Sequence, residues 1–142
     1  MMSKLTITLL GFAATLALAA PAIAAPVKAL SATPPMADGD MGCFIALGTI
    51  EMDAEKASKS DKLEQKDRDT MANLSQSMNK DSRWYFGRIS ALPPEQRTRA
   101  VFHAAFVRVD GADKKKTFDD AMACSKWALD TNTAMLDAWS GK

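Results

Sequence analysis

The residues with the most chemical potential in this 142-residue chain are two cysteines, Cys43 and Cys124, and a single histidine, His103. A zinc site needs about four cysteine, histidine or carboxylate ligands, and these three residues cannot supply them. No second histidine is available to support His103, and the chain has no Gly-x-Ser-x-Gly or Ser-x-x-Lys nucleophile motif. We therefore expect a non-enzymatic protein with no catalytic residue and no metal site.

The sequence does not favour haem or calcium as a cofactor. His103 is predicted to point roughly 130° away from the apolar stripe of its helix, toward solvent or a groove edge, where it could not ligate a buried haem. The chain also lacks a Cys-x-x-Cys-His attachment motif. Asp38-Gly39-Asp40 resembles the start of a calcium loop, but the later oxygen ligands are missing. We expect no cofactor.

Residues 1–24 have the three parts of a secretory signal peptide. Lys4 supplies a positive charge, residues 5–27 contain no charged side chain, and the segment 22–24 offers small residues to a signal peptidase. We predict cleavage after residue 24 and a periplasmic or secreted mature protein. The alternative is an uncleaved membrane anchor, which would need about 20 apolar residues. After cleavage we expect no stable membrane insertion.

Export determines how the two cysteines are interpreted. Exported proteins meet an oxidising compartment, so Cys43 and Cys124 are expected to form an intramolecular disulfide. Closing a loop of about 80 residues would contribute on the order of 4.5 kcal/mol in the loop-entropy model. Two buried free thiols, or one intermolecular bond, are the alternatives.

Charge limits the choice of partners. Cleavage removes Lys4 from the 18 basic residues and none of the 17 acidic ones, which leaves 17 of each. A chain with no net charge has no strong attraction to nucleic acid or anionic lipid. We expect a protein partner or a homo-oligomer and no nucleic acid.

The mature chain divides into two parts. Residues 25–38 are rich in Ala and Pro and predict a flexible tether, and residues 39–142 predict one helical domain. The most regular pattern lies in residues 71–92, where apolar residues recur every three or four positions. They are Met71, Leu74, Met78, Tyr85, Ile89 and Leu92.

A first helix is expected to begin near Met41, with Asp38 or Asp40 as its cap. Its apolar side has members four, three and four positions apart: Cys43, Leu47, Ile50 and Ala54. Gly48 is interpreted as a close approach to a neighbouring helix, and residues 55–60 as a loop.

The long second helix is expected to follow a capping box formed by Asp61 and Glu64. A break at residues 79–82 is the alternative, because three of those side chains could cap a new helix. Pro93 and Pro94 end this helix, and Pro94 suits the first position of the next one.

The third helix is expected to end at Asp110-Gly111. Lys114, Lys115 and Lys116 would oppose the dipole of a helix start, so they are placed in a loop and Thr117 is the predicted cap of the fourth helix. The apolar side of that helix, expected to face the core, comprises Phe118, Met122, Leu129, Leu136 and Trp139.

Four helical patterns and no convincing strand predict an all-α fold: a small bundle of about four helices around the long second helix, stapled by one disulfide. Trp84, Tyr85 and Phe86 span about 200° of that helix, so they cannot all face one narrow core. Trp84, Arg88 and Trp127 form a candidate contact surface. The alternative is that they are covered because the second helix is central.

Three features of the sequence carry a resemblance: Cys43-Phe44, the segment 85–89 and the late Cys124. Together they resemble a group of uncharacterised small exported bacterial all-helical proteins that have an early and a late cysteine. The resemblance implies a helical fold and an exported location, and it implies no activity.

These expectations favour an exported, non-enzymatic helical protein that acts in the periplasm by protein binding or self-association. One alternative is a stress holdase that exposes apolar surface in acid, where carboxylates lose their charge. Another is an enzyme or cofactor carrier with an unrecognised site.

Overall fold

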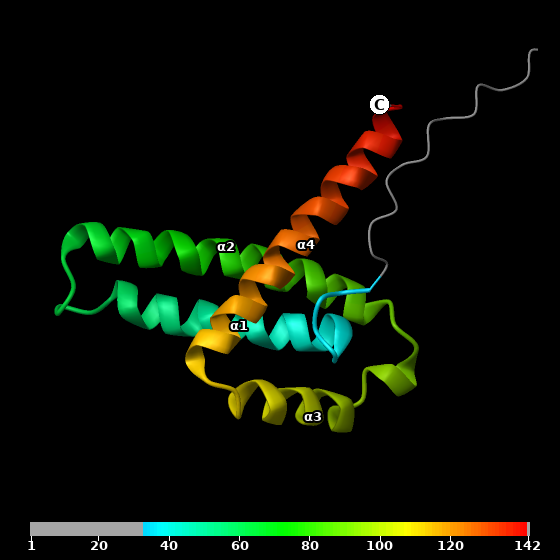
Figure 1. Cartoon of the computed structure of the whole chain (residues 1–142), viewed down its shortest axis with the longest axis horizontal. Coiled ribbons are helices and arrows are strands. Elements are labelled where there is room, and N and C mark those ends of the chain that lie inside the picture. The colour runs from blue at the N-terminus through cyan, green and yellow to red at the C-terminus, as the bar shows by residue number, and fades with distance from the viewer. Residues whose placement is uncertain (1–32, 142) are drawn as a thin grey trace, which may run out of the picture.

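The computed structural model describes residues 33–141 and shows an all-α fold with no strand in that range. Five helical elements follow one another along the chain (Figure 1): α1 (Gly39–Ser58), α2 (Gln65–Ser90), the short 3-10 helix η1 (Pro94–Gln96), α3 (Arg99–Asp110) and α4 (Lys114–Ser140). The predicted fold class is therefore confirmed. The predicted signal peptide, residues 1–24, and most of the predicted tether lie outside the described residues.

Helix α1 occupies the centre of the fold, a position that the sequence pattern assigns to α2. It contacts α2, α3 and α4, and Figure 1 shows α2 running antiparallel beside it while α4 crosses the pair. Residues 41–47 of α1 are buried with the exception of Phe44. A helix that is apolar around most of its circumference is stable only when it is covered on several sides.

Helix α2 is continuous through residues 79–82, so the alternative of a break there is wrong. The polar side chains in this stretch bind neighbouring helices instead of capping a new one. Asn79 donates a 2.5 Å hydrogen bond to Glu51 of α1, and Asp81 accepts a hydrogen bond from Ser125 of α4. Ser82 is buried on the same side of α2 as the apolar residues Met78 and Tyr85.

Two expectations about α1 are wrong. Residues 55–58 continue the helix, where an ion pair of 2.5 Å between Lys59 and Glu55 supports the last turn. Gly48 has open space around its Cα, whereas a Cβ at Gly42 would lie 3.0 Å from the Cβ of Asp38. The close approach is therefore made by the segment that leads into α1, in which Met36 packs against the core.

The start of α2 also differs from expectation. Glu64 occupies the N-cap position, but its side chain makes no capping hydrogen bond, and Asp61 lies in the preceding turn. The predicted capping box is therefore absent. The long helix depends on its packing against α1 more than on a favourable first turn.

The third helix begins later than Pro94. Pro94 and Glu95 belong to the 3-10 turn η1, and α3 begins at Arg99, where the hydroxyl of Thr98 accepts a hydrogen bond from the amide of Val101. The predicted end at Asp110 and Gly111 is confirmed.

The fourth helix begins at Lys114, so the placement of the three lysines in a loop is wrong. The carboxylate of Asp113 accepts a 2.8 Å hydrogen bond from the amide of Lys116 and caps the helix. Lys115 and Lys116 then form ion pairs of 2.5 Å one turn along the helix. These carboxylates offset the unfavourable position of the lysines at the positive end of the helix dipole.

The largest difference from expectation concerns the face that α4 buries. The residues turned toward the body are small: Thr117, Ala121, Cys124 and Ala128. The large apolar residues predicted to form the core are exposed, from Phe118 at 40% to Trp139 at 91%. In Figure 1 the second half of α4 extends beyond the α1–α2 pair. We call the exposed residues Phe118, Met122, Leu129, Leu136 and Trp139 the α4 stripe.

The predicted disulfide is confirmed and explains this orientation. Cys43 and Cys124 are bonded with their Cα atoms 5.5 Å apart, and both side chains are fully buried. Packed helices usually keep their axes 8–10 Å apart, and only small side chains fit where two backbones come this close. The bond therefore selects the Ala-rich face of α4 for burial.

We predict that the double substitution Cys43→Ala with Cys124→Ala lowers the free energy of unfolding by about 2–4 kcal/mol, because it releases a loop of 81 residues in the unfolded chain. Urea unfolding followed by circular dichroism measures the change. As a control, a reducing agent should destabilise the wild type and leave the double variant unaffected. Equal stability of wild type and variant would contradict the assignment of this role.

Candidate functional site

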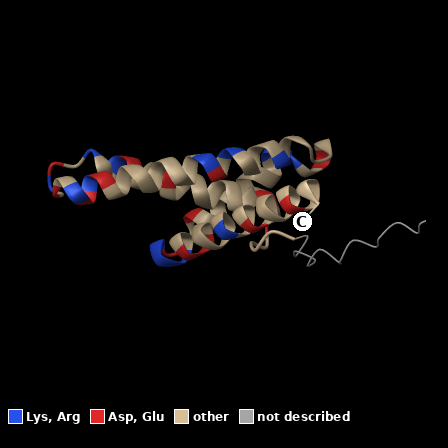
Figure 2. Cartoon of the chain, turned by 90° about the horizontal axis from the view of Figure 1, so that it is seen from above, with Lys and Arg blue, Asp and Glu red and all other residues tan. Residues whose placement is uncertain are grey.

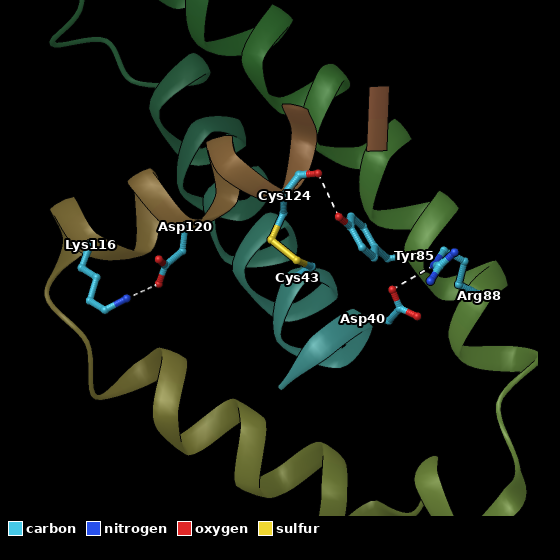
Figure 3. Close-up of a disulfide and its surroundings, with 7 residues drawn as sticks. All are labelled: Asp40, Cys43, Tyr85, Arg88, Lys116, Asp120 and Cys124. Atoms are coloured by element: carbon cyan, nitrogen blue, oxygen red, sulfur yellow. Dashed lines mark hydrogen bonds and ion pairs between the residues drawn. A yellow bond between two sulfur atoms is a disulfide. The ribbon is translucent and has the colours of Figure 1, made fainter. Parts of the chain in front are cut away.

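A polar junction lies where α1, α2 and α4 meet, next to the disulfide. Tyr85 of α2 is fully buried there, and its hydroxyl donates a 2.9 Å hydrogen bond to the backbone carbonyl of Cys124 (Figure 3). A buried hydroxyl needs such a partner because an unpaired one costs about 1–3 kcal/mol. Tyr85 thus ties α2 to the turn of α4 that carries the disulfide.

An ion pair closes the same junction on the side of α1. The guanidinium of Arg88 donates a 2.9 Å hydrogen bond to the carboxylate of Asp40, which is 8% exposed (Figure 3). Asp40 also lies in the first turn of α1, where a negative charge is favoured by the helix dipole. A buried carboxylate without such partners would be strongly destabilising.

The guanidinium of Arg88 is also shared between two indole rings. It lies 5.1 Å from the ring centroid of Trp84 and 5.1 Å from that of Trp127, and the two rings lie 5.7 Å apart at a steep angle. Cation–π contacts of this kind contribute about 0.5–2 kcal/mol each. Trp127 in turn stacks on Tyr85 with the planes inclined by 22°.

The structure therefore brings together all three residues of the candidate contact surface, Trp84, Arg88 and Trp127. They are half-buried, and both rings pack against the core. Of the three successive aromatic residues of α2, Tyr85 is buried, Trp84 is half-buried and Phe86 is exposed, as the angular argument required. A role for these residues in binding a partner stays a prediction.

The contacts at this junction hold α1, α2 and α4 together. Burial raises the pKa of the Tyr85 phenol above its ordinary value, and the nearby carboxylate of Asp40 raises it further. A phenol that stays protonated and donates to a helix carbonyl has no role as an acid or base at neutral pH. His103 is exposed, and residues 33–141 contain no group of three or more His, Cys, Asp or Glu side chains that could hold a metal ion.

The α4 stripe is the more unusual feature. Its large apolar side chains lie outside the core, and three more apolar residues of α3, Val101, Phe102 and Phe106, are between 38% and 42% exposed. Charged residues of both signs are distributed over the helices, with a basic cluster at the start of α4 (Figure 2). Periodicity identifies this apolar face, but the same periodicity cannot distinguish a face that meets the core from one that meets another molecule.

Comparisons of the chain with protein-family models, with curated proteins and with solved structures gave no match. Among the described helices, none combines the length and apolar character needed to cross a bilayer. Functional inference therefore depends on the surfaces of this structure.

We predict that Tyr85 stays protonated well above about pH 10, the value at which an exposed tyrosine ionises. The pKa is raised in the folded state, so the stability that Tyr85 contributes is complete below about pH 10 and is lost as the pH rises above it. Because the chain has one tyrosine, phenolate absorbance in an alkaline titration reports on this residue alone.

Phenolate absorbance should therefore appear together with alkaline unfolding, detected by circular dichroism. The control is Tyr85→Phe, which removes the absorbance change and costs about 1 kcal/mol through the lost hydrogen bond. Ionisation near pH 10 in a protein that remains folded would show that the ring is accessible to solvent.

Proposed function

We propose that this is an exported, non-enzymatic helical protein that acts by binding polypeptide through the α4 stripe, and that its first partner is a second copy of itself. The observation that carries the proposal is the inverted packing of α4, which buries small residues and exposes large ones. Large apolar side chains exposed next to one another on a surface mark an interaction site in soluble proteins.

The spacing of the stripe supports helix pairing. Phe118, Met122, Leu129 and Leu136 are separated by four, seven and seven positions, and Trp139 follows three positions later. Asn132 occupies the position between Leu129 and Leu136, so residues 129–139 follow the spacing of a heptad seam of the kind that packs in coiled coils. Ser125 falls on the same spacing but is bonded to Asp81 of α2, so the part of the seam open to a partner lies from Leu129 onward. A polar residue such as Asn132 in a seam helps to specify register.

The charges along α4 favour an antiparallel pair. Residues 114–126 contain four lysines against two aspartates, whereas residues 127–140 contain two aspartates and no basic residue. Antiparallel pairing places the basic half of one helix beside the acidic half of the other. A two-fold axis near the middle of α4 satisfies both contacts at once, as expected for a symmetric dimer.

The disulfide supports the exported location, because such bonds persist in oxidising compartments. The signal-like composition of residues 1–24 supports it independently. Periplasmic placement is part of the proposal.

We expect the purified protein to form a dimer and Leu129→Asp to convert it to a monomer. Each dimer would bury two copies of Leu129, each contributing about 1.5–3 kcal/mol, so the dissociation constant should rise at least ~100-fold. Sedimentation velocity over a range of concentrations measures this change.

Met52→Asp is the matched control, since Met52 is 63% exposed on α1 and Leu129 is 65% exposed on α4. It should leave the dimer intact. A wild-type protein that is monomeric at high concentration, or an equal effect of the two substitutions, would contradict pairing through α4.

A stress holdase is the second candidate, favoured by the same exposed apolar residues. At about pH 2–3 carboxylates are protonated, so both halves of α4 lose their negative charges and an antiparallel pair would separate, which exposes the stripe. This idea predicts that the protein suppresses aggregation of an unfolded client in acid and loses that activity in Leu129→Asp. Light scattering of the client at pH 2–3 and at pH 7 measures it. No suppression at either pH would exclude the holdase.

A further inference from the structure

A second apolar surface lies at the end of the bundle where α1, α2 and the start of α3 meet, away from α4. It is a groove of about 320 Å³ whose described walls include Phe44, Phe86 and Phe102, and none of its described lining residues belongs to α4. Met41 and Ile89 are nearly buried and lie along its floor. We call it the aromatic groove.

Two arginines stand at the edge of the aromatic groove. Arg97 and Arg99 both contribute to its lining and are exposed. Within residues 33–141, neither guanidinium forms an ion pair, although Glu95 lies close in sequence. The other arginines near this end, Arg88 and Arg108, are paired with Asp40 and Asp38.

The aromatic rings offer substantial apolar area. Phe86 is 58% exposed, and its ring centroid lies 5.9 Å from that of Phe44. On the opposite wall the ring of Phe102 is 40% exposed and stacks with Phe106 at 6.4 Å. Aromatic side chains left in water around a concave surface recover free energy when an apolar ligand covers them.

We infer that the aromatic groove binds a single-chain apolar anion, a medium-chain fatty acid, with its hydrocarbon against the phenylalanine rings and its carboxylate on Arg97 and Arg99. The arginine fork matches a carboxylate, and the two positive charges lack a counter-charge from the described chain. The volume lies at the lower end of ligand pockets, which suits one acyl chain and not a two-chain lipid.

A peptide fits this groove less well. Phe44, Phe86, Ile89 and Phe102 of the lining lie within helices, where their backbone groups are hydrogen-bonded in the helix and cannot pair with a peptide. Free helix amides occur at the start of α3, beside Arg99. A peptide backbone placed against the rings would leave its own amides unpaired, at a cost of about 1–3 kcal/mol for each buried group. An acyl chain has no such groups.

The test is isothermal titration of the protein, purified after expression of the full chain, with decanoate below its micelle concentration. We expect saturable binding that weakens at least about tenfold in the double substitution Arg97→Gln with Arg99→Gln, whereas decanol binding stays unchanged because it lacks the charge. Phe86→Ala should weaken decanoate and decanol alike. Circular dichroism confirms that each variant is folded.

The control for charge is Arg83→Gln, an exposed arginine of α2 that does not line the groove, and it should bind decanoate as the wild type does. Absence of decanoate binding, equal binding of decyltrimethylammonium, or an unchanged affinity in the double arginine variant would each overturn the inference. So would tighter binding of a short peptide that ends in phenylalanine. Because Leu129 lies on a different surface, Leu129→Asp should bind decanoate normally, so this test is independent of the proposed dimer.

Discussion

The close approach of two helix backbones at the disulfide is the constraint on which the rest of the structure depends. With the Cα atoms of Cys43 and Cys124 only 5.5 Å apart, α4 must present alanines and a threonine to α1. Phe118, Met122 and Leu129 lie about a quarter to a third of a turn away on the same helix and are consequently turned outward. Leu136 and Trp139 are exposed because the second half of α4 extends beyond the α1–α2 pair. The crossing at the disulfide thus accounts for the small residues that α4 buries and for the outward orientation of the large residues near it.

The polar junction next to the disulfide completes that arrangement. Tyr85 binds the carbonyl of Cys124, and Arg88 joins the first turn of α1 to two indole rings on α2 and α4. The hydroxyl of Tyr85, the carbonyl of Cys124 and the carboxylate of Asp40 each have a hydrogen-bond partner, as a buried network requires if it is to stabilise the fold. The junction accounts for the cohesion of three helices.

The α4 stripe and the aromatic groove differ in chemistry, so each surface suits a different kind of partner. The α4 stripe is long, lies on one helix and has a charge gradient along it, which suits another helix. The aromatic groove is short and concave, and its two edge arginines form no ion pair within residues 33–141, which suits a small apolar anion. A protein with both surfaces could pair with its copy and carry a ligand independently.

Much of the fold could be predicted from the sequence, because local patterns act over a few residues. The helix content, the end of α3 at Asp110 and the pairing of the cysteines all follow from periodicity, turn chemistry and redox context. The apolar face of α4 was also visible in the spacing of its residues. Periodicity, however, reports that a face is apolar and not which molecule covers it.

Only the tertiary structure decided which face of α4 is buried, that α1 is central and that Arg88 lies between Trp84 and Trp127. These outcomes depend on contacts between residues far apart in the chain, such as the pair at positions 40 and 88, whose encounter no local pattern encodes. The physical reason is that a short bridge between two backbones admits only small side chains at the crossing point. That steric limit overrides the tendency of the larger residues to be buried.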